Sequence, residues 1–173
     1  AVDNSGNVFV TGTSDASISV FLWNYTDYAT IAYSGAGVPL WTNRYNGPGN
    51  YDDIATAAAV DSNGNVFVTG YSAATNGYPY NSDYATIAYS GAGVALWTNR
   101  YDGPVNGDDY ATAVAVDGSG NVVVTGASAS GFDSSAYLIY DYYTAKYAAA
   151  NGALEPSWTS FCCPPERSRP GAG

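Results

Sequence analysis

A tandem repeat is the strongest constraint that this sequence places on its fold. One segment occurs three times, at offsets of 58 and 56 residues, as Ala1–Ser14, Ala59–Ser72 and Ala115–Ser128. A second segment, Asp27–Pro48, returns as Asp83–Pro104 with differences only at Pro39/Ala95 and Asn46/Asp102. Its third copy begins at Asp141 and stops matching after Leu154. Each copy should fold in the same way and bury its apolar surface against its neighbours.

Four strand-like runs are found in each copy. In the middle copy, alternating side chains and β-forming residues predict strands at Ile54–Asp61, Asn65–Ser72, Tyr84–Ser90 and Val94–Tyr101. The segments Asp61–Asn65 and Ser90–Gly93 are rich in turn residues and predict tight hairpins. The longer connection between the second and third runs differs in length and composition between copies, as exposed loops do.

Four antiparallel strands in every copy are typical of a β-propeller blade. We therefore predict an all-β, propeller-type array over residues 1–154, with blades at about 1–48, 49–104 and 105–154. Three blades give an open arc, because a propeller needs roughly four or more blades to close. A right-handed β-helix is the rival fold, but it would need shorter coils and ladders of stacked side chains.

The charge of the chain narrows its range of partners. The formal net charge is −10, so phosphate backbones and anionic membrane surfaces are repelled and nucleic-acid binding is not expected. No apolar run approaches the roughly 18 residues that a membrane-spanning helix needs, so no membrane insertion is expected. Proteins and carbohydrates remain as partners. The two neighbouring cysteines, Cys162 and Cys163, do not make a disulfide framework.

Catalytic motifs are absent from the sequence. The chain has no His, which removes the Ser-His-Asp and Cys-His nucleophile systems and His-based zinc sites, and it has no Gly-rich phosphate loop. Its carboxylates recur with the repeat, at Asp3/Asp61/Asp117, at Asp27/Asp83/Asp141 and in the pairs Asp52-Asp53/Asp108-Asp109. Because a catalytic centre is normally one asymmetric constellation, recurring acids are expected to serve the blade. We predict no catalytic residues and no cofactor.

The hairpin at Asp61 offers one candidate metal site. Asp61 is expected to cap the turn by accepting backbone N–H bonds. The alternative is calcium, since Asp61, Asn63 and Asn65 present alternate oxygens. The Gly that follows Asn63 stands at the fourth position of this loop rather than at the sixth, where a calcium loop of EF-hand type carries it.

Large aromatic residues recur near the end of each full copy. Trp41 and Trp97 occupy the same repeat position, and we expect them to fill the space between adjacent blades rather than to form a sugar-stacking platform. Arg44 and Arg100 are expected to pair with a neighbouring Asp at the exposed rim of a blade, where such a pair contributes at most about 1 kcal/mol.

Residues that do not repeat are better candidates for binding specificity. Loops on one face of a repeat scaffold usually carry its binding site, and Tyr-rich loops suit protein or carbohydrate contacts. The candidate ligand residues in or near the three long loops are Trp23, Tyr25, Tyr71, Tyr78, Tyr80 and Phe132. The alternative is that they are ordinary surface aromatics.

A family resemblance rests on three strings of the middle copy. Ala59–Ser72, Asp83–Tyr89 and Leu96–Pro104 resemble the bacterial SBBP, or seven-bladed β-propeller, repeat, and the similarity runs three times over residues 1–154. The family usually has Lys where Ala32 and Ala88 stand, and Lys146 keeps it in the third copy. The resemblance implies a scaffold without an established activity, in a large secreted or envelope-associated bacterial protein, and hence an extracellular or cell-envelope location.

The two ends of the chain differ from the repeat. Residues 155–173 hold both Cys and both Glu, and we expect them to be disordered, either as an out-of-frame tail or as a genuine linker. Ala1 enters partway through a blade, so the chain is expected to be a fragment whose open blade edges favour self-association.

The sequence therefore favours a non-catalytic propeller scaffold for protein or carbohydrate interaction. Two alternatives stay open: a propeller-fold hydrolase or lyase with its active residues in further blades, and a structural repeat protein that assembles with itself.

Overall fold

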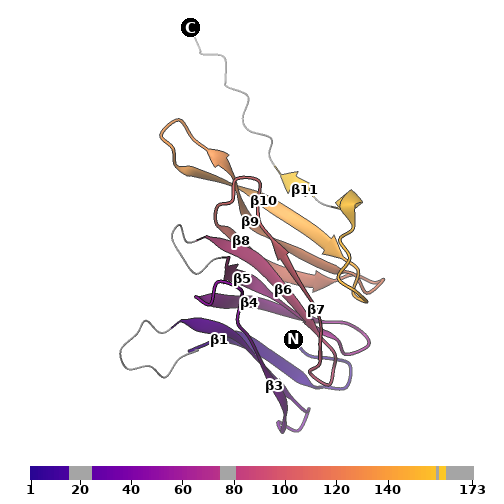
Figure 1. Ribbon diagram of the computed structural model, residues 1–173. Coiled ribbons are helices and arrows are strands. Elements are labelled where there is room, and N and C mark those ends of the chain that lie inside the picture. Colours follow the sequence, from indigo (N-terminus) through magenta and orange to yellow (C-terminus); the bar gives the residue numbers. More distant parts are fainter. Residues whose placement is uncertain (16–24, 75–80, 159, 163–173) are drawn as a thin grey trace.

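Three antiparallel sheets, stacked face to face, make up the computed structural model, which describes residues 1–15, 25–74, 81–158 and 160–162 (Figure 1). Blade 1 contains β1 (Val8–Asp15), β2 (Thr26–Tyr33) and β3 (Pro39–Tyr45). Blade 2 contains β4 (Asp53–Val60), β5 (Val66–Ala73), β6 (Ser82–Tyr89) and β7 (Ala95–Tyr101). Blade 3 contains β8 (Asp109–Val116), β9 (Val122–Phe132), β10 (Leu138–Tyr147) and β11 (Ser160–Cys162). The predicted all-β fold of open, propeller-like blades is confirmed.

The strands of blade 2 agree with the four runs expected from the sequence to within two residues at each end. Turn chemistry explains why they end where they do. Gly64 and Gly93 adopt φ values of 82° and 80°, a region that side chains disfavour, and each closes a hairpin by donating its N–H to a carbonyl three residues earlier. Both hairpins recur in the neighbouring copies, with Gly6, Gly37 and Gly120 in the same conformation.

Alternation along β5 places its side chains in two different cores. Val66 and Val68 point toward blade 1, where they pack with Phe9 and Ile87. Phe67 points the other way, into a core shared with blade 3. All three are fully buried, because blade 2 is covered on both faces. We call the contact between blades 1 and 2 the first junction and the contact between blades 2 and 3 the second junction.

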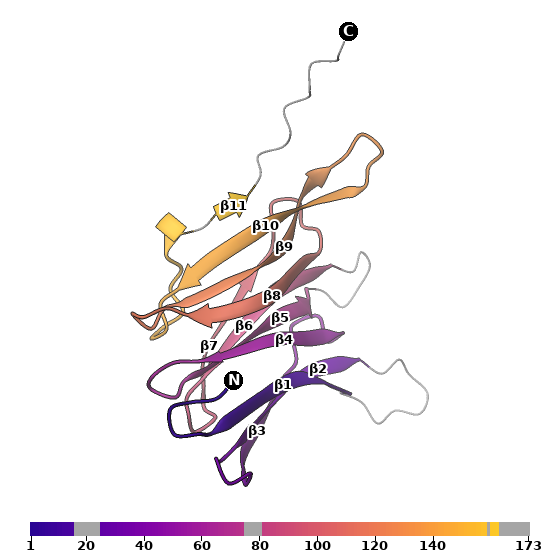
Figure 2. The same ribbon diagram turned by 180° about the vertical axis from the view of Figure 1, so that it is seen from behind.

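The outer face of blade 1 carries the same residues as the covered face of blade 2. β1 lies at the repeat position of β5, so Val10 corresponds to Val68. Val10 is 52% exposed, whereas Val68 is 0% exposed. The predicted open arc therefore leaves an apolar sheet face uncovered at this end of the described array, as both views of the stack show (Figures 1 and 2).

The C-terminal segment departs from the repeat but adds to blade 3. A turn of 3-10 helix, η1 (Pro156–Trp158), precedes β11, which pairs with β10 at Tyr142–Thr144. This differs from the expected structureless tail, because the outer edge of β10 presents unpaired backbone groups that an extended segment can join. Residues 159 and 163–173 lie outside the described part, so for them the expectation stays a prediction. Within the described residues, no helix is long and apolar enough to cross a bilayer.

Candidate functional site

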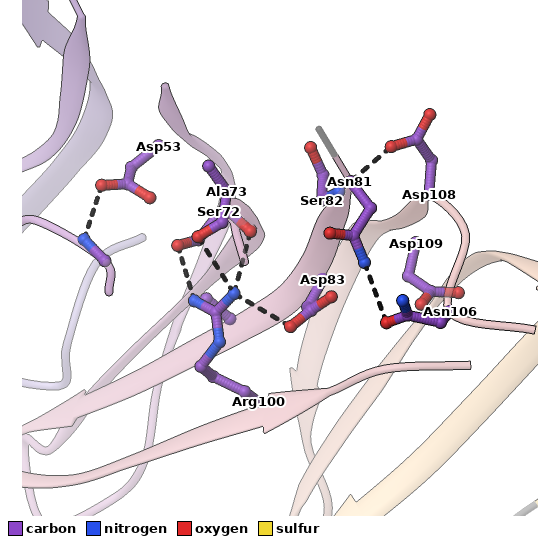
Figure 3. A network of polar contacts seen from close by, with 12 residues as sticks. Asp53, Ser72, Ala73, Asn81, Ser82, Asp83, Arg100, Asn106, Asp108 and Asp109 are labelled. Atoms are coloured by element: carbon purple, nitrogen blue, oxygen red, sulfur yellow. Dashed lines mark hydrogen bonds and ion pairs between the residues drawn. The ribbon is translucent and has the colours of Figure 1, made fainter. Parts of the chain in front are cut away.

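The segments that connect one blade to the next lie beside the N-terminal ends of β2 and β6. Asp52, in the link from β3 to β4, accepts hydrogen bonds from the N–H and hydroxyl of Thr26, both at 3.0 Å. The second junction repeats the arrangement, with the N–H of Ser82 donating to Asp108 at 3.0 Å (Figure 3). We call this end of the stack, with residues 25–26, 46–53, 71–74, 81–83, 102–110 and 131–140, the loop face. It contains two groups of residues with functional potential.

Tyrosine rings form the first group. The Tyr25 ring centroid lies 4.1 Å from that of Tyr51, and the Tyr71 ring meets that of Tyr110 edge-on at 4.8 Å. Tyr110 in turn lies 6.3 Å from Tyr140. The pairs Tyr25–Tyr51 and Tyr71–Tyr110 each join one blade to the connection or first strand that begins the next. Tyr110 and Tyr140 belong to two strands of blade 3, so they extend the aromatic contacts within that blade.

The predicted ligand residues are only partly brought together. Tyr25 and Tyr71 belong to the ring pairs, and Phe132, the last residue of β9, is 58% exposed. Trp23, Tyr78 and Tyr80 lie outside the described residues.

Sequence reasoning missed the partner rings, but the repeat contained a signal for them. Tyr51, Tyr110 and Tyr140 stand where the aligned copies carry Gly107, Ile54 and Ser82. A tyrosine that replaces a small or aliphatic residue of the repeat marks a place where one copy departs from the common scaffold.

The hairpin at Asp61 shows the predicted cap. Asp61 Oδ1 accepts hydrogen bonds from the N–H groups of Asn63 and Asn65, both at 2.8 Å, and Asp61 Oδ2 accepts one from Asn65 Nδ2 at 2.8 Å. Asp3 and Asp117 make the same contacts in their turns. The carboxylate thus serves the turn, and the alternative of calcium at Asp61, Asn63 and Asn65 stays an untested prediction.

Three carboxylates form the second group, at the second junction. Asp83 is the second residue of β6, Asp102 follows β7, and Asp109 opens β8. One oxygen atom from each lies within 4.8 Å of the other two. Asp83 and Asp109 are buried, while Asp102 is exposed. The chain links these positions through the β7–β8 connection and the pairing of β6 with β7, so the cluster spans the boundary between blades 2 and 3.

Arg100 supplies the positive charge beside this cluster. Its Nη2 atom lies 3.0 Å from Asp83 Oδ2 and also donates to the carbonyls of Ser72 and Ala73 (Figure 3). Its Nη1 atom donates to Ser72 Oγ at 2.6 Å and to the hydroxyl of Tyr45 in blade 1 at 3.2 Å.

The expected Asp–Arg pairs are both present, but the expectation of an exposed rim is wrong for one of them. The Arg100 side chain is 22% exposed and its Asp83 partner 9%, because blade 1 covers this face of blade 2. The Arg44 side chain, paired with Asp27 at 3.1 Å on the uncovered face of blade 1, is 42% exposed.

Burial raises the pKa of both buried acids of the cluster. For Asp83, desolvation is the main cause, the hydrogen bond and charge of Arg100 oppose it, and the charges of Asp102 and Asp109 add to it. For Asp109, desolvation again dominates the raised pKa, against hydrogen bonds from the side chain of Ser128 and the N–H of Gly103. For both acids, the cost of burying the charged form thus outweighs the stabilisation that hydrogen bonds and Arg100 provide.

One oxygen of the cluster is without a hydrogen-bond donor. Both oxygens of Asp109 accept backbone N–H bonds, from Gly103 at 2.6 Å and from Ala129 at 3.1 Å. Asp83 Oδ2 is bound by Arg100, whereas Asp83 Oδ1 is buried and has no hydrogen-bond partner among the described residues. A buried acceptor of this kind costs about 1–3 kcal/mol and calls for an explanation.

The first junction holds a similar group, in which Asp53 Oδ1 is also buried without a hydrogen-bond partner among the described residues and in which one of the three acids is replaced. Asp27, Asn46 and Asp53 occupy the repeat positions of Asp83, Asp102 and Asp109. Asp53 Oδ2 accepts the N–H of Gly47 at 2.6 Å, as Asp109 does with Gly103. Asn46, however, is neutral, and it donates its amide to Asn50 Oδ1 at 2.7 Å. Oxygen ligands for a cation are therefore better developed at the second junction.

Comparison with known proteins gives a distant match. No protein-family model matches the chain, so the SBBP family is not shown. The chain is 26% identical over 189 residues to an uncharacterized WD repeat-containing protein of Acanthamoeba polyphaga mimivirus. The alignment covers 86% of this chain, and the chain spans about 13% of the length of that relative. The match agrees with a β-propeller-like repeat.

Proposed function

We propose that the chain is a non-catalytic, propeller-like scaffold that binds a partner protein through its loop face. One observation carries the proposal: tyrosines that break the repeat gather on this face, in the pairs Tyr25–Tyr51 and Tyr71–Tyr110 and at Tyr140. Rigid aromatic side chains with a polar tip are favoured at protein-binding surfaces. The WD repeat relative supports an interaction role, and the absence of His and of phosphate-loop motifs from the sequence agrees with it.

The exposed residues of the loop face suggest the chemistry of the partner. Phe132, Tyr137 and Tyr140 are 58%, 72% and 42% exposed, and Asp52, Asp102 and Asp133 are exposed beside this end of the stack. With a net charge of −10, the chain attracts cationic partners. The partner is therefore a basic protein segment with apolar or aromatic anchors.

We propose membership of the SBBP repeat family and an extracellular or cell-envelope location in a longer bacterial protein. The support is the resemblance of the three repeat strings, of which Leu96–Pro104 carries the Trp and Arg that the blade junctions use. A genomic sequence that extends this reading frame into further copies behind a secretion signal would test both parts.

Selection of peptides on the immobilised chain tests the binding role. We expect basic peptides with aromatic or aliphatic anchors, and at least tenfold weaker binding by a Phe132→Ser, Tyr137→Ser double variant. A Val94→Ser, Leu96→Ser variant is the matched control, since both residues are similarly exposed, at 62% and 46%, but lie at the opposite end of blade 2, in the turn before β7 and at the start of β7. Equal loss in both variants, or no selected peptide, would contradict the proposal. Binding to a glycan array alone would favour carbohydrate instead.

Self-assembly is a second candidate, supported by the open face of blade 1. Val10 and Ile31 line a surface hollow of about 350 Å³ there, together with Ala29, Thr42 and Arg44. The same positions in blade 2 are covered by blade 1. Concentration-dependent association in sedimentation experiments, abolished by Val10→Lys, would favour this role over binding of a separate partner. A propeller-fold hydrolase or lyase would instead require active residues in further blades.

A further inference from the structure

We infer that the second junction contains a binding site for a calcium ion, formed by Asp83, Asp102 and Asp109. This inference stands apart from the proposed binding role of the loop face. Calcium binding is expected at the boundary between blades 2 and 3 because Asp102 is present there and not at the corresponding position of the first junction.

The spacing of the three carboxylates fits a single shared ion. Calcium is bound by oxygen atoms at about 2.3–2.6 Å, so two of its ligands can lie no farther apart than about 5 Å. One oxygen each from Asp83, Asp102 and Asp109 lies within 4.8 Å of the other two. Magnesium, with oxygens at about 2.0–2.1 Å, demands a stricter octahedral geometry, keeps several water ligands and is usually held by only one or two carboxylates. A set of three protein carboxylates is therefore more typical of calcium.

The unpartnered oxygen of Asp83 is an independent indication of a ligand. The residue is 7% exposed, and its Oδ1 atom is buried without any hydrogen-bond donor among the described residues. In Figure 3 the oxygen that faces Arg100 carries the hydrogen bond, and the other oxygen lies on the side of Asp109. A cation between Asp83 and Asp109 would satisfy this oxygen and remove the cost of leaving it bare.

The charge of the site matches a divalent cation. Three carboxylates stand against one guanidinium, which leaves an excess of two negative charges. All the side-chain ligands are hard oxygen atoms, the type that calcium and magnesium prefer over zinc or copper. The exposed Asp102 gives the ion a route from solvent to the two buried acids.

A bound ion would act as a clamp between blades. Asp83 belongs to β6 of blade 2 and Asp109 to β8 of blade 3, while Asp102 begins the connection between the two blades. Tying the three together fixes where blade 3 starts relative to the loop face. The first junction, with Asn46 in place of Asp102, lacks one of the three charges and is expected to bind calcium more weakly.

Calcium titration of the full chain by calorimetry and by thermal unfolding tests this inference. We expect one strong site and an unfolding temperature that rises with calcium. Asp102→Asn, which gives the second junction the composition of the first, is expected to weaken binding at least tenfold without unfolding the chain, because Asp102 is exposed. Asp133→Asn makes the same charge change at an exposed turn and should leave affinity unaltered.

The reciprocal variant Asn46→Asp provides a gain of function. We expect it to create a second site at the first junction, so that the number of calcium ions bound per chain doubles. The inference is overturned if calcium shifts neither heat nor unfolding temperature up to millimolar concentration. It is also overturned if Asp102→Asn and Asp133→Asn weaken binding equally, because calcium would then respond only to net charge and the bare oxygen would be satisfied by water.

Discussion

The two junctions of the molecule are built from the same contacts. At the first, Trp41 Nε1 donates to the carbonyl of Gly91 at 2.9 Å and Asn43 Nδ2 to that of Gly93 at 2.6 Å. At the second, Trp97 and Asn99 donate to the carbonyls of Ala149 and Gly152, both at 2.7 Å. A buried tyrosine hydroxyl crosses each boundary as well, from Tyr28 to Ala85 and from Tyr84 to Tyr143. The repeat therefore encodes the way in which one blade docks on the next.

The junctions differ where blade 3 departs from the repeat. The hydroxyl of Tyr45 accepts a hydrogen bond from Arg100 of the following blade. Its counterpart Tyr101 stacks instead on the ring of Tyr143, at 3.6 Å and an angle of 7°. Blade 3 has Tyr143 where blade 2 has Ala85, and its fourth strand, β11, has no arginine that corresponds to Arg100. The tryptophan, asparagine and tyrosine contacts between blades are thus the same at both junctions. The positions that differ between the copies carry the loop-face tyrosines and the acid cluster.

Loss of either junction tryptophan should cost the most stability, and about equally. Trp41→Ala and Trp97→Ala each remove an indole that packs on phenylalanine and tyrosine rings from both sides of its junction. Because both indoles are only partly buried, we expect losses near the lower end of the usual range, about 3 kcal/mol of unfolding free energy. Urea denaturation measures this. A loss at one site only would show that the two junctions are not equivalent.

Substitution of Arg100, on the covered face of blade 2, should cost more unfolding free energy than substitution of Arg44, on the uncovered face of blade 1. Arg100→Gln breaks a largely buried pair with Asp83 and a hydrogen bond to blade 1, so we expect a loss of about 2 kcal/mol in calcium-free buffer. Arg44→Gln breaks the equivalent pair on the open face, where solvent screens it, and less than about 1 kcal/mol is expected. Equal losses at both sites, again by urea denaturation, would mean that the face of blade 1 is also covered in solution.

The smallest loss of stability should come from removing one methylene group from an isoleucine on the covered face of blade 2 or on the uncovered face of blade 1. Ile87 is 2% exposed, so Ile87→Val is expected to cost about 1 kcal/mol. Ile31, its counterpart on the outer face of blade 1, is only partly buried, and Ile31→Val should change stability by about half of that or less. Thermal unfolding at several protein concentrations provides the control. A cost at Ile31 that grows with concentration would reveal association of copies through that face.

Much of the scaffold could be predicted from the sequence because its signals are local or repeated. The Asp61 turn is decided by neighbours within four residues, and Trp41 and Trp97 recur at one position with an apolar role. The acid cluster could not be predicted, since Asp83 and Asp109 belong to different blades and meet only when blade 3 stacks on blade 2. Because aspartates recur in the copies, the sequence favoured a structural role for all of them. Asp102 is the acid of the cluster that the first copy lacks, since Asn46 stands at its position.

The pairing of β11 with β10 had no sequence signal either. Ser160–Cys162 share no pattern with the fourth strand of the repeat, Ala95–Tyr101. Backbone groups at a sheet edge accept almost any extended segment, so side-chain patterns carry little information about such a pairing. The loop-face tyrosines could be predicted in part. Each differs from the residue at the same position of the aligned copies, but only the structure shows which rings contact each other.

The central claim is that successive repeats dock as blades through equivalent tryptophan junctions, and nuclear magnetic resonance tests it most directly. A Cβ atom built on Gly93 would lie 2.7 Å from the Trp41 ring, and one on Gly152 would lie 2.8 Å from the Trp97 ring. We expect ring-current-shifted Hα signals for both glycines, nuclear Overhauser contacts to these indoles, and indole N–H groups protected from exchange. Contacts of either indole with its own repeat alone would contradict it.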